Sequence, residues 1–533
     1  MLNFINEIID SDVNPPTGFR FSPENNGHLH IGHAKSICLN FGLAEKYNSF
    51  CNLRFDDTNP SNEKEEYIES ITKDIEWLGY TPKNIFFTSD YFDKIYDYAI
   101  ILIKKGLAYV EDLSSEEIAI LKGSPTNPGK DSPYRTRSIS ENIDLFKRMW
   151  IGEFKEESRT LRAKIDMKSP NMILRDPIIY RIIDKPHYRT LSKYKIYPMY
   201  DFAHPLSDYI EHISHSICTM EFLPHRDFYD WVLNNITSGA KPRQIEFARL
   251  NVDYTMMSKR HLNKMVESGL VEGLDDPRMP TLSGMRRRGY TPESIKDFCE
   301  KVGVTKRNSL VSHLLLEDCL RNDLNKRCDR IMGVIDPVKL TITNWDKGVE
   351  MVEIENNPEN DSTRMVPFDG IIWIERDDFN LNPNRKYNRL KIGGEVRLKG
   401  AYVIKATEVI KNKDGEVIEI LCTYDHLTKS GMEMDRRIKG TIHWVSIKHG
   451  INADIRNYDN LLTKECPDKD FINCFNDRSL STIKNAVIEP SIINCTNSKA
   501  VQMIRKGYYI IDKDSTKEKI IINRVVPMKS SYI

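Results

Sequence analysis

The segment Gly18-Phe-Arg-Phe-Ser-Pro-Glu-Asn-Asn-Gly-His-Leu-His-Ile-Gly-His33 decides the fold of the first part of this chain. Its first four residues, up to Phe21, are typical of a buried strand, and the residues from about Gly32 to Tyr47 predict a helix. A glycine-containing turn separates the two. A strand, a glycine turn and a helix in this order begin a βαβ unit, which predicts a parallel sheet.

The same alternation continues further along the chain. Phe50 to Phe55 predict a second strand, and apolar residues at helical spacing from Ile68 to Leu78 predict a second helix. This order predicts a doubly wound, Rossmann-like sheet. Ligands bind such sheets beyond the carboxyl ends of the strands, so we expect binding loops at 22–27 and 56–60.

Length and composition limit the class of protein. The chain has 533 residues, of which 40% are hydrophobic, and its 77 basic and 77 acidic residues give a formal net charge of zero. At about 150 residues per domain, this length predicts three or four domains. A net charge of zero is not typical of nucleic-acid-binding domains, which tend to be basic. A chain of several domains can nevertheless keep basic and acidic surfaces apart.

No stretch approaches the run of about 18 apolar residues that a membrane span requires. The first 14 residues predict a short amphipathic helix rather than a signal peptide. The ten cysteines are scattered, without the spacing of a zinc site or of a disulfide framework. We therefore expect a soluble, cytoplasmic protein whose own side chains bind no metal.

The chain divides into four regions by pattern. We expect a Rossmann-like domain over residues 1–98 and 200–260, with an insertion over 99–199. A helical connector is expected over 261–332 and a β region over 333–533. In the connector, helix ends are expected at Gly284 and Gly289. In the last region, β-branched and aromatic runs predict one or two β-barrels, and these runs are 370–374, 395–398, 402–405 and 417–424. The predicted fold class is multidomain α/β plus all-β.

The turn before the first helix contains His28, His30 and His33. Two imidazoles three residues apart at a helix N-terminus can donate hydrogen bonds to phosphate oxygens, where the helix dipole favours an anion. Gly32 leaves room for a phosphate or a base to approach the backbone. Alone, this pattern fits a surface histidine cluster equally well.

A second signal lies far downstream, at Met257-Ser-Lys-Arg260. A mobile loop that ends in lysine can bring an ammonium group to the charge that develops on a pyrophosphate. Short basic segments are usually only solvated, so this interpretation depends on the pairing with the histidine motif.

The two motifs, in this order, resemble the HIGH and KMSKS signatures of class I aminoacyl-tRNA synthetases. Longer segments are similar to the glutaminyl-tRNA synthetases of the bacterial type, and they are Gly32 to Gly42, Asn52-Leu-Arg-Phe-Asp-Asp-Thr-Asn-Pro60, Tyr197-Pro-Met-Tyr-Asp-Phe-Ala-His204, Glu272 to Pro280, Ile335 to Leu340 and Gly440 to Val445. The resemblance covers essentially the whole chain.

The resemblance implies a two-step reaction. ATP and L-glutamine form glutaminyl adenylate and pyrophosphate, and a terminal adenosine hydroxyl of tRNA(Gln) then takes the glutaminyl group. Mg²⁺ accompanies the ATP, and we expect a monomer. The insertion is expected to bind the acceptor end of the tRNA, and the β region its anticodon loop. The implied catalytic residues are His30, His33 and Lys259.

The resemblance also assigns binding residues. Positions that match the ATP pocket are Glu24, Asn25, Asn26, His30, Ile31, Gly32, His33, Ala34, Lys35, Ser36, Thr219, Arg249, Leu250, Met257, Ser258 and Lys259. Positions that match the glutamine pocket are Asp56, Tyr200, Arg20, His204, Cys218 and Gln244. In that pocket Asp56 matches the carboxylate that holds the substrate ammonium, and Tyr200 its phenol partner. The residues expected to bind tRNA are Arg330, Arg389, Gln502, Arg505, Thr305, Lys306 and Arg307.

Cys218 separates glutamine from glutamate as the predicted substrate. A free γ-carboxylate in a closed pocket requires a cation, because an unpaired buried charge is costly. The related glutamate enzymes carry an arginine at the position of Cys218, and a neutral thiol suits an amide. The sequence therefore predicts glutamine, and a Cys218→Arg substitution is expected to shift the preference toward glutamate.

Three positions depart from the family pattern. Pro224 replaces an acidic residue that reads the acceptor stem, Pro125 replaces an apolar wedge near the first base pair, and Lys386 replaces an anticodon-reading glutamine. The contacts by which the family recognises its tRNA therefore cannot be transferred to this chain at these three positions. Three other functions remain open on sequence alone: a glutamate-charging enzyme, a catalytically inactive tRNA-binding paralogue, and a small nucleotidyltransferase.

Overall fold

The structure is a computed structural model that describes residues 4–13, 15–23, 27–61, 65–359, 361–434, 436–467, 471–494 and 499–529. The chain forms two compact units. Unit 1 contains residues 1–251, 257–259 and 299–311. Unit 2 contains residues 252–256, 260–298 and 312–533. In the part of the chain that is described, no helix is both long enough and apolar enough to cross a membrane.

Unit 1 is built on parallel strands, as the sequence predicts. The strands β1 (Gly18–Phe21), β2 (Phe50–Phe55) and β3 (Ile85–Phe87) pair in parallel in this order. A second parallel pair consists of β8 (His215–Thr219) and β9 (Arg243–Phe247). Ser214 N–H donates to Gly18 O at 3.0 Å, which brings the start of β8 next to β1.

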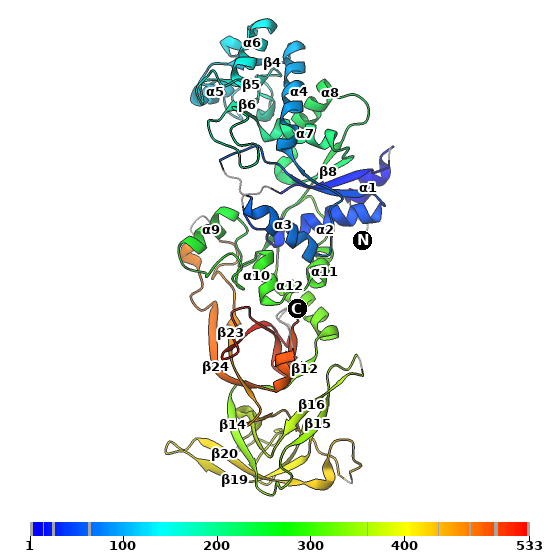
Figure 1. The fold of residues 1–533 in the computed structure, drawn as a ribbon, viewed down its shortest axis with the longest axis vertical. Coiled ribbons are helices and arrows are strands. Elements are labelled where there is room, and N and C mark those ends of the chain that lie inside the picture. Colours follow the sequence, from blue (N-terminus) through cyan, green and yellow to red (C-terminus); the bar gives the residue numbers. More distant parts are fainter. Residues whose placement is uncertain are drawn as a thin grey trace. The chain divides into compact units, whose positions relative to one another are not determined.

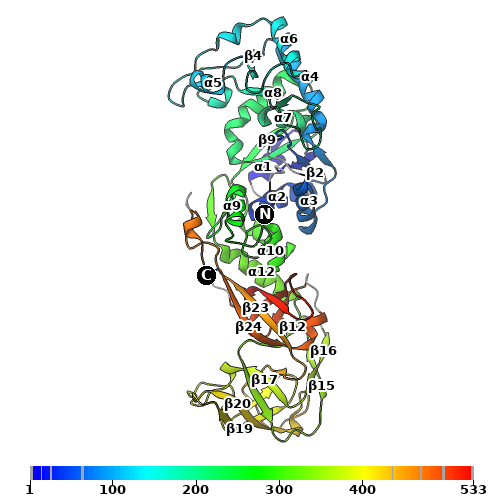
Figure 2. The ribbon, with the colours of Figure 1, turned by 60° about the vertical axis from the view of Figure 1, so that its left-hand side comes forward.

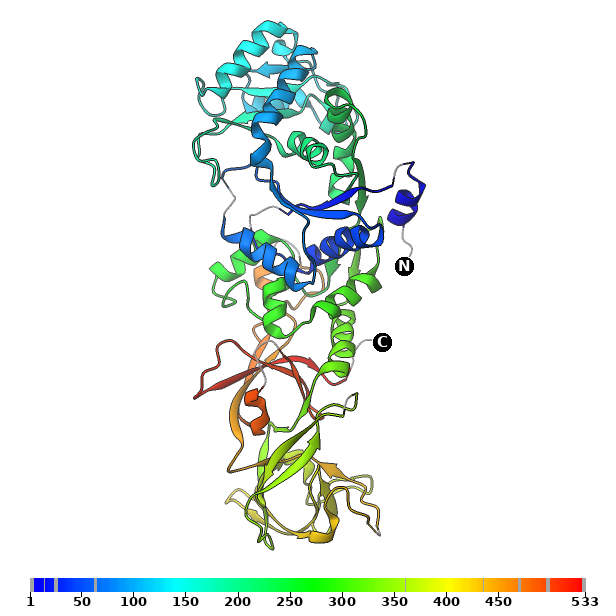
Figure 3. The same ribbon diagram turned by 45° about the vertical axis from the view of Figure 1, so that its right-hand side comes forward.

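Helices cover both sides of these strands. Figures 1 and 3 show α2 (Ile31–Lys46) and α3 (Glu66–Trp77) on one side, and α7 (Tyr200–Ile210) and α8 (Arg226–Ile236) on the other. The N-terminal helix α1 (Phe4–Ser11) is also present, as predicted. The doubly wound arrangement is therefore confirmed. Helix α2 begins at Ile31, after the loop that follows the carboxyl end of β1.

Within unit 1, the segment 92–198, which contains most of the expected insertion 99–199, folds around an antiparallel sheet. Its strands are β4 (Ala108–Glu111), β5 (Thr160–Ala163), β6 (Ile178–Ile182) and β7 (Ile196–Pro198), and its helices are α4 (Phe92–Lys104), α5 (Ser115–Lys122) and α6 (Ile139–Trp150). The core of this sheet is continuous with the two helices α7 and α8, because Leu161 and Phe146 belong to one buried cluster with Phe202 and Phe228.

The connector region contains α9 (Lys259–Glu267), α10 (Leu282–Arg288), α11 (Pro292–Val302) and α12 (His313–Arg327). Gly289 ends α10 in the left-handed conformation (φ +104°), as expected. The expected helix end at Gly284 is wrong, because Gly284 lies inside α10. A Cβ atom there would come within 2.5 Å of Asp276 O. This glycine therefore serves close packing of the helix against a loop.

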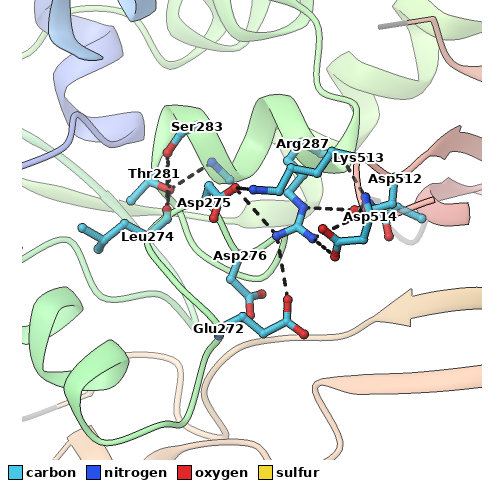
Figure 4. A network of polar contacts seen from close by, with 12 residues as sticks. Glu272, Leu274, Asp275, Asp276, Thr281, Ser283, Arg287, Asp512, Lys513 and Asp514 are labelled. Carbon is cyan, nitrogen blue, oxygen red and sulfur yellow. Dashed lines mark hydrogen bonds and ion pairs between the residues drawn. The ribbon is translucent and has the colours of Figure 1, made fainter. Parts of the chain in front are cut away.

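Polar contacts join α10 to the C-terminal strands of unit 2. Figure 4 shows Arg287 among Asp512, Asp514, Asp275 and Glu272. Arg287 Nη2 lies 3.0 Å from Asp512 Oδ1, and the Asp512 side chain is fully buried.

The β region forms two seven-stranded sheets. One has the order β12 (Arg330–Ile331), β25 (Val501–Met503), β26 (Gly507–Ile511), β27 (Ile520–Pro527), β23 (Ile451–Tyr458), β24 (Leu480–Ile488) and β13 (Gly333–Val334). The other has the order β21 (Thr441–Ile442), β18 (Glu395–Leu398), β19 (Val403–Lys411), β20 (Val417–Asp425), β14 (Pro337–Ile342), β17 (Ile371–Glu375) and β22 (Val445–Ser446). We call them the upper and the lower sheet, and Figure 2 shows them as separate bodies.

The lower sheet is accompanied by a hairpin of β15 (Glu350–Glu355) and β16 (Thr363–Phe368). Each sheet has its own buried cluster, centred on residues such as Trp444 for the lower sheet and Ile455 for the upper one. All four predicted runs of the β region contribute to strands, in agreement with the predicted all-β character of this region.

Candidate active site

The two histidines of the HxGH motif cap the helix α2. His30 is the N-cap residue, and its Nδ1 accepts a hydrogen bond from Gly32 N–H at 3.1 Å. His33 Nδ1 accepts from His30 N–H at 3.1 Å. The side chains thus satisfy backbone donors that a helix N-terminus leaves unpaired. The ring centroids lie only 3.8 Å apart.

These contacts determine the protonation of both imidazoles. Burial and the charges of Lys259 and Arg249 lower the pKa of His30 to about 3, against a weaker opposing hydrogen bond with the Met257 backbone. Burial, His30 and Lys259 lower the pKa of His33 well below its usual range. Both rings are therefore neutral at pH 7. Because each Nδ1 accepts, the proton of each ring is on Nε2, which becomes a hydrogen-bond donor.

The downstream motif lies directly against the histidine turn within unit 1. A Cβ atom on Gly27 would lie 3.2 Å from Lys259 Cδ, and one on Gly32 would lie 3.4 Å from Met257 Sδ. The two glycines therefore allow the stem of Lys259 and the side chain of Met257 to approach the turn closely. The structure brings the two sequence signals into one site.

The remaining positions expected at ATP differ in accessibility. Ile31, Ala34 and Leu250 are buried core residues, whereas Gly32, Ser36, Thr219, Met257 and Ser258 are partly or fully accessible. Lys35 is buried, and its Nζ donates to Ala248 O at 3.1 Å. Arg249 is exposed and pairs with Glu221 at 2.7 Å. Glu24, Asn25 and Asn26 lie outside the described residues.

Asp56 follows β2 and has one carboxylate oxygen without a partner. Its Oδ1 accepts from Arg54 Nε at 2.6 Å and from Thr88 Oγ1 at 3.2 Å. Its Oδ2 is buried and has no hydrogen-bond partner among the described residues. Buried polar atoms are almost always satisfied, so Oδ2 is suited to a donor from a ligand.

Arg20 and His204 converge on Asp208 beside this carboxylate. Arg20 Nε donates to Asp208 Oδ1 at 3.2 Å, and His204 Nε2 lies 3.0 Å from Asp208 Oδ2. Burial opposes protonation of His204, but the charge and hydrogen bond of Asp208 outweigh it and raise the pKa of His204 to about 9. Asp208 also binds Arg54 Nη1 at 2.6 Å. One buried carboxylate thus holds three basic groups in place.

Cys218 contacts this network directly. Arg20 Nη2 lies 3.3 Å from Cys218 Sγ and 2.8 Å from Ser216 Oγ. Burial favours the neutral thiol, yet Arg20 and His204 lower the pKa of Cys218 to about 7. The sequence argument assumed that no cation lies at Cys218. The structure places the Arg20 guanidinium there, with its charge already paired to Asp208.

The other two residues expected at glutamine also lie in this region. Tyr200 begins α7, and its ring stacks on His204 with centroids 5.2 Å apart. Burial and the negative charge of Asp56 raise the pKa of Tyr200 well above its usual value, so its phenol stays neutral. Gln244 Nε2 donates to Phe222 O and to Glu246 Oε1 at 3.1 and 2.9 Å.

Sequence reasoning missed four residues of this network, which are Arg54, Thr88, Asp208 and Glu211. Arg54 lies two residues before Asp56, in one of the segments that resemble the family, but the resemblance assigned no role to Arg54. Asp208 follows His204 by four residues on a helix, a spacing that predicts a contact. Thr88 and Glu211 had no local signal, because only the fold brings them to Asp56 and Arg54.

The residues expected to bind tRNA lie in different settings. Thr305, Lys306 and Arg307 form an exposed loop of unit 1. In unit 2, Arg330 on β12 is paired in register with Gln502 on β25. Gln502 is buried, and its Nε2 donates to Tyr508 OH at 2.9 Å. Arg389 and Arg505 are partly exposed and share one partner, Asp378.

The described residues contain no group of three or more His, Cys, Asp or Glu side chains arranged to hold a metal ion. All cysteines in the described ranges are free thiols, and Cys495 lies outside them.

Family models of one group of proteins match most of this chain. The model of the tRNA synthetases class I (E and Q) catalytic domain matches residues 18–326. Two models of the anti-codon binding domain of the same group match residues 328–425 and 441–512.

Curated relatives match over nearly the full length. The glutamine–tRNA ligase of Proteus mirabilis is 52% identical, over 99% of this chain and 97% of that protein. That of Clostridium perfringens is also 52% identical, over 99% and 98%. A solved glutamate-tRNA synthetase structure from Elizabethkingia anophelis has 18% identity and a TM-score of 0.43, covering 59% of this chain and 71% of that chain. The chain therefore belongs to the glutamine–tRNA ligase family within the class I tRNA synthetases.

Proposed function

We propose that this protein catalyses the ATP-dependent attachment of L-glutamine to tRNA(Gln) for translation. In the first step, a carboxylate oxygen of glutamine attacks the α-phosphorus of ATP, and the bond to the β-phosphate oxygen breaks. Glutaminyl adenylate and pyrophosphate result. In the second step, a terminal adenosine hydroxyl of the tRNA attacks the glutaminyl carbonyl carbon, and AMP leaves.

The observation that carries this proposal is the close approach of Met257 and Lys259 to the turn that contains His30 and His33. His30 and His33 are neutral and carry their protons on Nε2 at a helix N-terminus, where the dipole favours phosphate. The Lys259 ammonium lies beside them and can stabilise the charge that develops on the departing pyrophosphate. In-line displacement requires such positioning and charge stabilisation rather than a covalent nucleophile. Mg²⁺ enters with ATP as part of the substrate.

The Asp56 carboxylate supports binding of an amino acid. Its unpartnered, buried Oδ2 is suited to the substrate ammonium, and the neutral phenol of Tyr200 lies nearby as a second polar partner. Arg20, His204, Cys218 and Gln244 complete the proposed glutamine pocket.

The charges around Cys218 favour glutamine over glutamate. Arg20 lies 3.3 Å from the thiol, and both Arg20 and the protonated His204 are paired with Asp208. A glutamate carboxylate would therefore have to compete with Asp208 for these cations, whereas an amide needs no counter-charge. Cys218→Arg adds a second guanidinium beside Arg20 and is expected to raise the acceptance of glutamate. A folded variant with unchanged preference for glutamine would contradict this account.

The tRNA is proposed to contact both units. The insertion 99–199 would bind the acceptor end and the β region 333–533 the anticodon loop, with the connector 261–332 between them in sequence. Arg330, Arg389, Gln502 and Arg505 are the proposed anticodon contacts, and Thr305 to Arg307 are proposed to contact tRNA elsewhere. The free thiols support a reducing compartment such as the cytoplasm.

The deciding experiment is aminoacylation of bulk tRNA with labelled glutamine and, separately, labelled glutamate. We expect ATP-dependent labelling with glutamine at a kcat/KM far above that with glutamate. Labelling with glutamate alone would assign the protein to the glutamate-charging enzymes. Absence of labelling with either amino acid would leave a tRNA-binding role and refute the proposed reaction.

A further inference from the structure

A buried carboxylate lies where the upper and lower sheets meet in unit 2. Asp378 is the last residue of the short 3₁₀ helix η5 (Arg376–Asp378), which follows β17 of the lower sheet. Arg505 lies in the turn between β25 and β26 of the upper sheet. The two residues belong to the two separate segments that match anti-codon binding domains.

Asp378 holds two arginines at once. Its Oδ1 lies 2.8 Å from Arg505 Nη1 and 2.9 Å from Arg389 Nη1, and its Oδ2 accepts from Arg505 Nη2. The Asp378 side chain is fully buried, whereas those of Arg389 and Arg505 are 43% and 30% exposed. The carboxylate is therefore hidden from solvent, whereas both arginine side chains are partly accessible.

Further contacts fix Arg505 in this orientation. Its Nη2 and Nε lie 2.8 and 3.2 Å from His443 Nδ1. Arg505 also has a positive φ of +67°, which is rare for a residue with a side chain. Such backbone conformations persist where the surroundings enforce them, and they are frequent at functional sites.

Arg389 keeps part of its donor capacity available. Its segment is anchored by the backbone, since Leu390 N–H donates to Asp378 O at 3.0 Å. Within the described ranges, the Arg389 guanidinium has partners only at Nη1, namely Asp378 Oδ1 and, at 3.5 Å, Asp377 O. Its Nε and Nη2 groups are thus available to an external acceptor.

We propose that Asp378 is a positioning residue that holds Arg389 and Arg505 as a rigid pair of donors for an unpaired base of the tRNA anticodon loop. This inference rests on the proposed function. Proteins read RNA sequence mainly on unpaired bases, through hydrogen bonds to base edges and stacking on arginine planes. A long arginine side chain loses rotamer freedom when it binds. A carboxylate that orders both side chains beforehand removes part of that loss, which is the principle of preorganisation.

Asp378→Asn is the variant that tests this role. The amide keeps the shape of the side chain, but its NH₂ group faces a guanidinium donor, so the paired geometry is lost. The backbone contact to Leu390 remains. The matched control is Asp336→Asn in the same β body, because exposed Asp336 pairs with exposed Arg376 at 3.4 Å and the substitution changes the net charge equally.

The measurement is discrimination between cognate tRNA(Gln) and the same tRNA with single anticodon substitutions, as a ratio of kcat/KM. We expect Asp378→Asn to lower this ratio roughly tenfold, the effect of losing one base contact. The KM values for glutamine and ATP are expected to stay unchanged. Asp378→Glu, which retains the charge, is expected to restore part of the discrimination, and Asp336→Asn to leave it at the wild-type value.

Each outcome of this experiment is decisive. The discrimination of Asp378→Asn is measured at a temperature where thermal unfolding shows that the variant is folded. If it equals that of the wild type, Asp378 has only a structural role and the proposal is overturned. An equal loss in Asp336→Asn would also overturn it, because net charge alone would then explain the effect. Failure of the wild-type protein to charge any tRNA with glutamine would instead refute the proposed function, and this inference with it.

Discussion

At the scale of single residues, the Asp56 carboxylate shows how the fold orients a group that is proposed to bind the substrate. Its two oxygens have different environments, because Arg54 and Thr88 occupy Oδ1 and leave Oδ2 unpartnered. The orientation of the carboxylate therefore depends on residues that do not themselves face the substrate. Removing one of these donors allows the group to rotate away from the ammonium that it is proposed to bind.

Thr88→Val tests this dependence with little change in shape. The valine lacks the hydroxyl that donates to Asp56 Oδ1, so we expect the KM for glutamine to rise roughly fivefold, equivalent to about 1 kcal/mol. The KM for ATP is expected to remain within experimental error. Thr72→Val in α3 is the matched control, because it removes a hydroxyl whose partner among the described residues is Ile68 O. An equal rise in both KM values of Thr88→Val would argue for a general disturbance of the site.

Glu211 gives the site a predictable response to pH. Burial, the main cause, together with Asp208 and Asp56 raises the pKa of Glu211 to about 7, against the opposing charges of Arg54 and Arg20. In the unfolded chain this carboxyl loses its proton near pH 4.5. The unfolded state thus ionises first, and the contribution of Glu211 to stability falls as pH rises from about 4.5 to about 7.

Glu211→Gln is expected to remove this loss. Between pH 5 and pH 8, the free energy of unfolding of the variant should increase relative to wild type by about 2 to 3 kcal/mol. Denaturant unfolding at both pH values measures the difference. The exposed Glu76→Gln in α3 should show no such change, and a constant offset for Glu211→Gln at both pH values would contradict the assignment.

At the scale of elements, helix α10 is tied to the C-terminal strands of unit 2 by Arg287 (Figure 4). The guanidinium is almost fully buried and bonds Asp512 through both Nε and Nη2 at 3.0 Å. Asn523 and Arg456 also approach Asp512, but Arg287 is its only bidentate partner among the described residues. Loss of Arg287 would remove the main counter-charge of the buried Asp512 carboxylate.

Arg287→Ala is therefore expected to destabilise unit 2 by about 3 kcal/mol, the usual cost of removing one member of a buried ion pair. Lys513→Ala removes a half-exposed partner of Asp275 in the same network and should cost less than about 1 kcal/mol. Urea unfolding followed by a probe in unit 2 compares the two variants. Equal effects would show that burial does not control the strength of this network.

The N-terminus of α2 illustrates a second property of elements. The same two histidines that are proposed to contact phosphate also cap the helix, because each Nδ1 accepts a backbone N–H. This double use fixes the tautomer of each ring. A local sequence pattern thus determines both where the helix begins and which ring nitrogen carries the proton.

At the scale of the whole molecule, the formal net charge of zero does not describe the surface that meets a phosphate backbone. Basic residues such as Lys306, Arg307, Arg389 and Arg505 lie at least partly exposed, while many acidic residues pair with arginines inside the protein. Phosphate contacts release counterions, so their number appears in the salt dependence of binding rather than in the net charge.

We expect the KM for tRNA to rise at least tenfold between 50 and 200 mM salt, as several phosphate contacts require. The KM for glutamine should change little, because the residues proposed to bind it are buried and their charges are weakly screened by salt. Steady-state aminoacylation at a series of salt concentrations measures both. A KM for tRNA that stays constant would show that few basic side chains contact the phosphates.

The sequence by itself determined the parallel sheet and the strands of the β region, since these depend on local periodicity and on turn residues. It was wrong at Gly284, because a glycine required for close packing has the same local pattern as one that ends a helix. The identity of the two motifs and the expected roles of Asp56 and Cys218 came from the resemblance to a known family.

Only the tertiary structure decided how these groups are charged and oriented. The neutral state of His30 and His33 depends on burial beside Lys259, which is distant in sequence. The pairing of Arg20 with Asp208, and of Arg389 and Arg505 with Asp378, likewise joins residues far apart in the chain. Electrostatic energies depend on distance and on solvent exposure, and a linear sequence contains neither quantity.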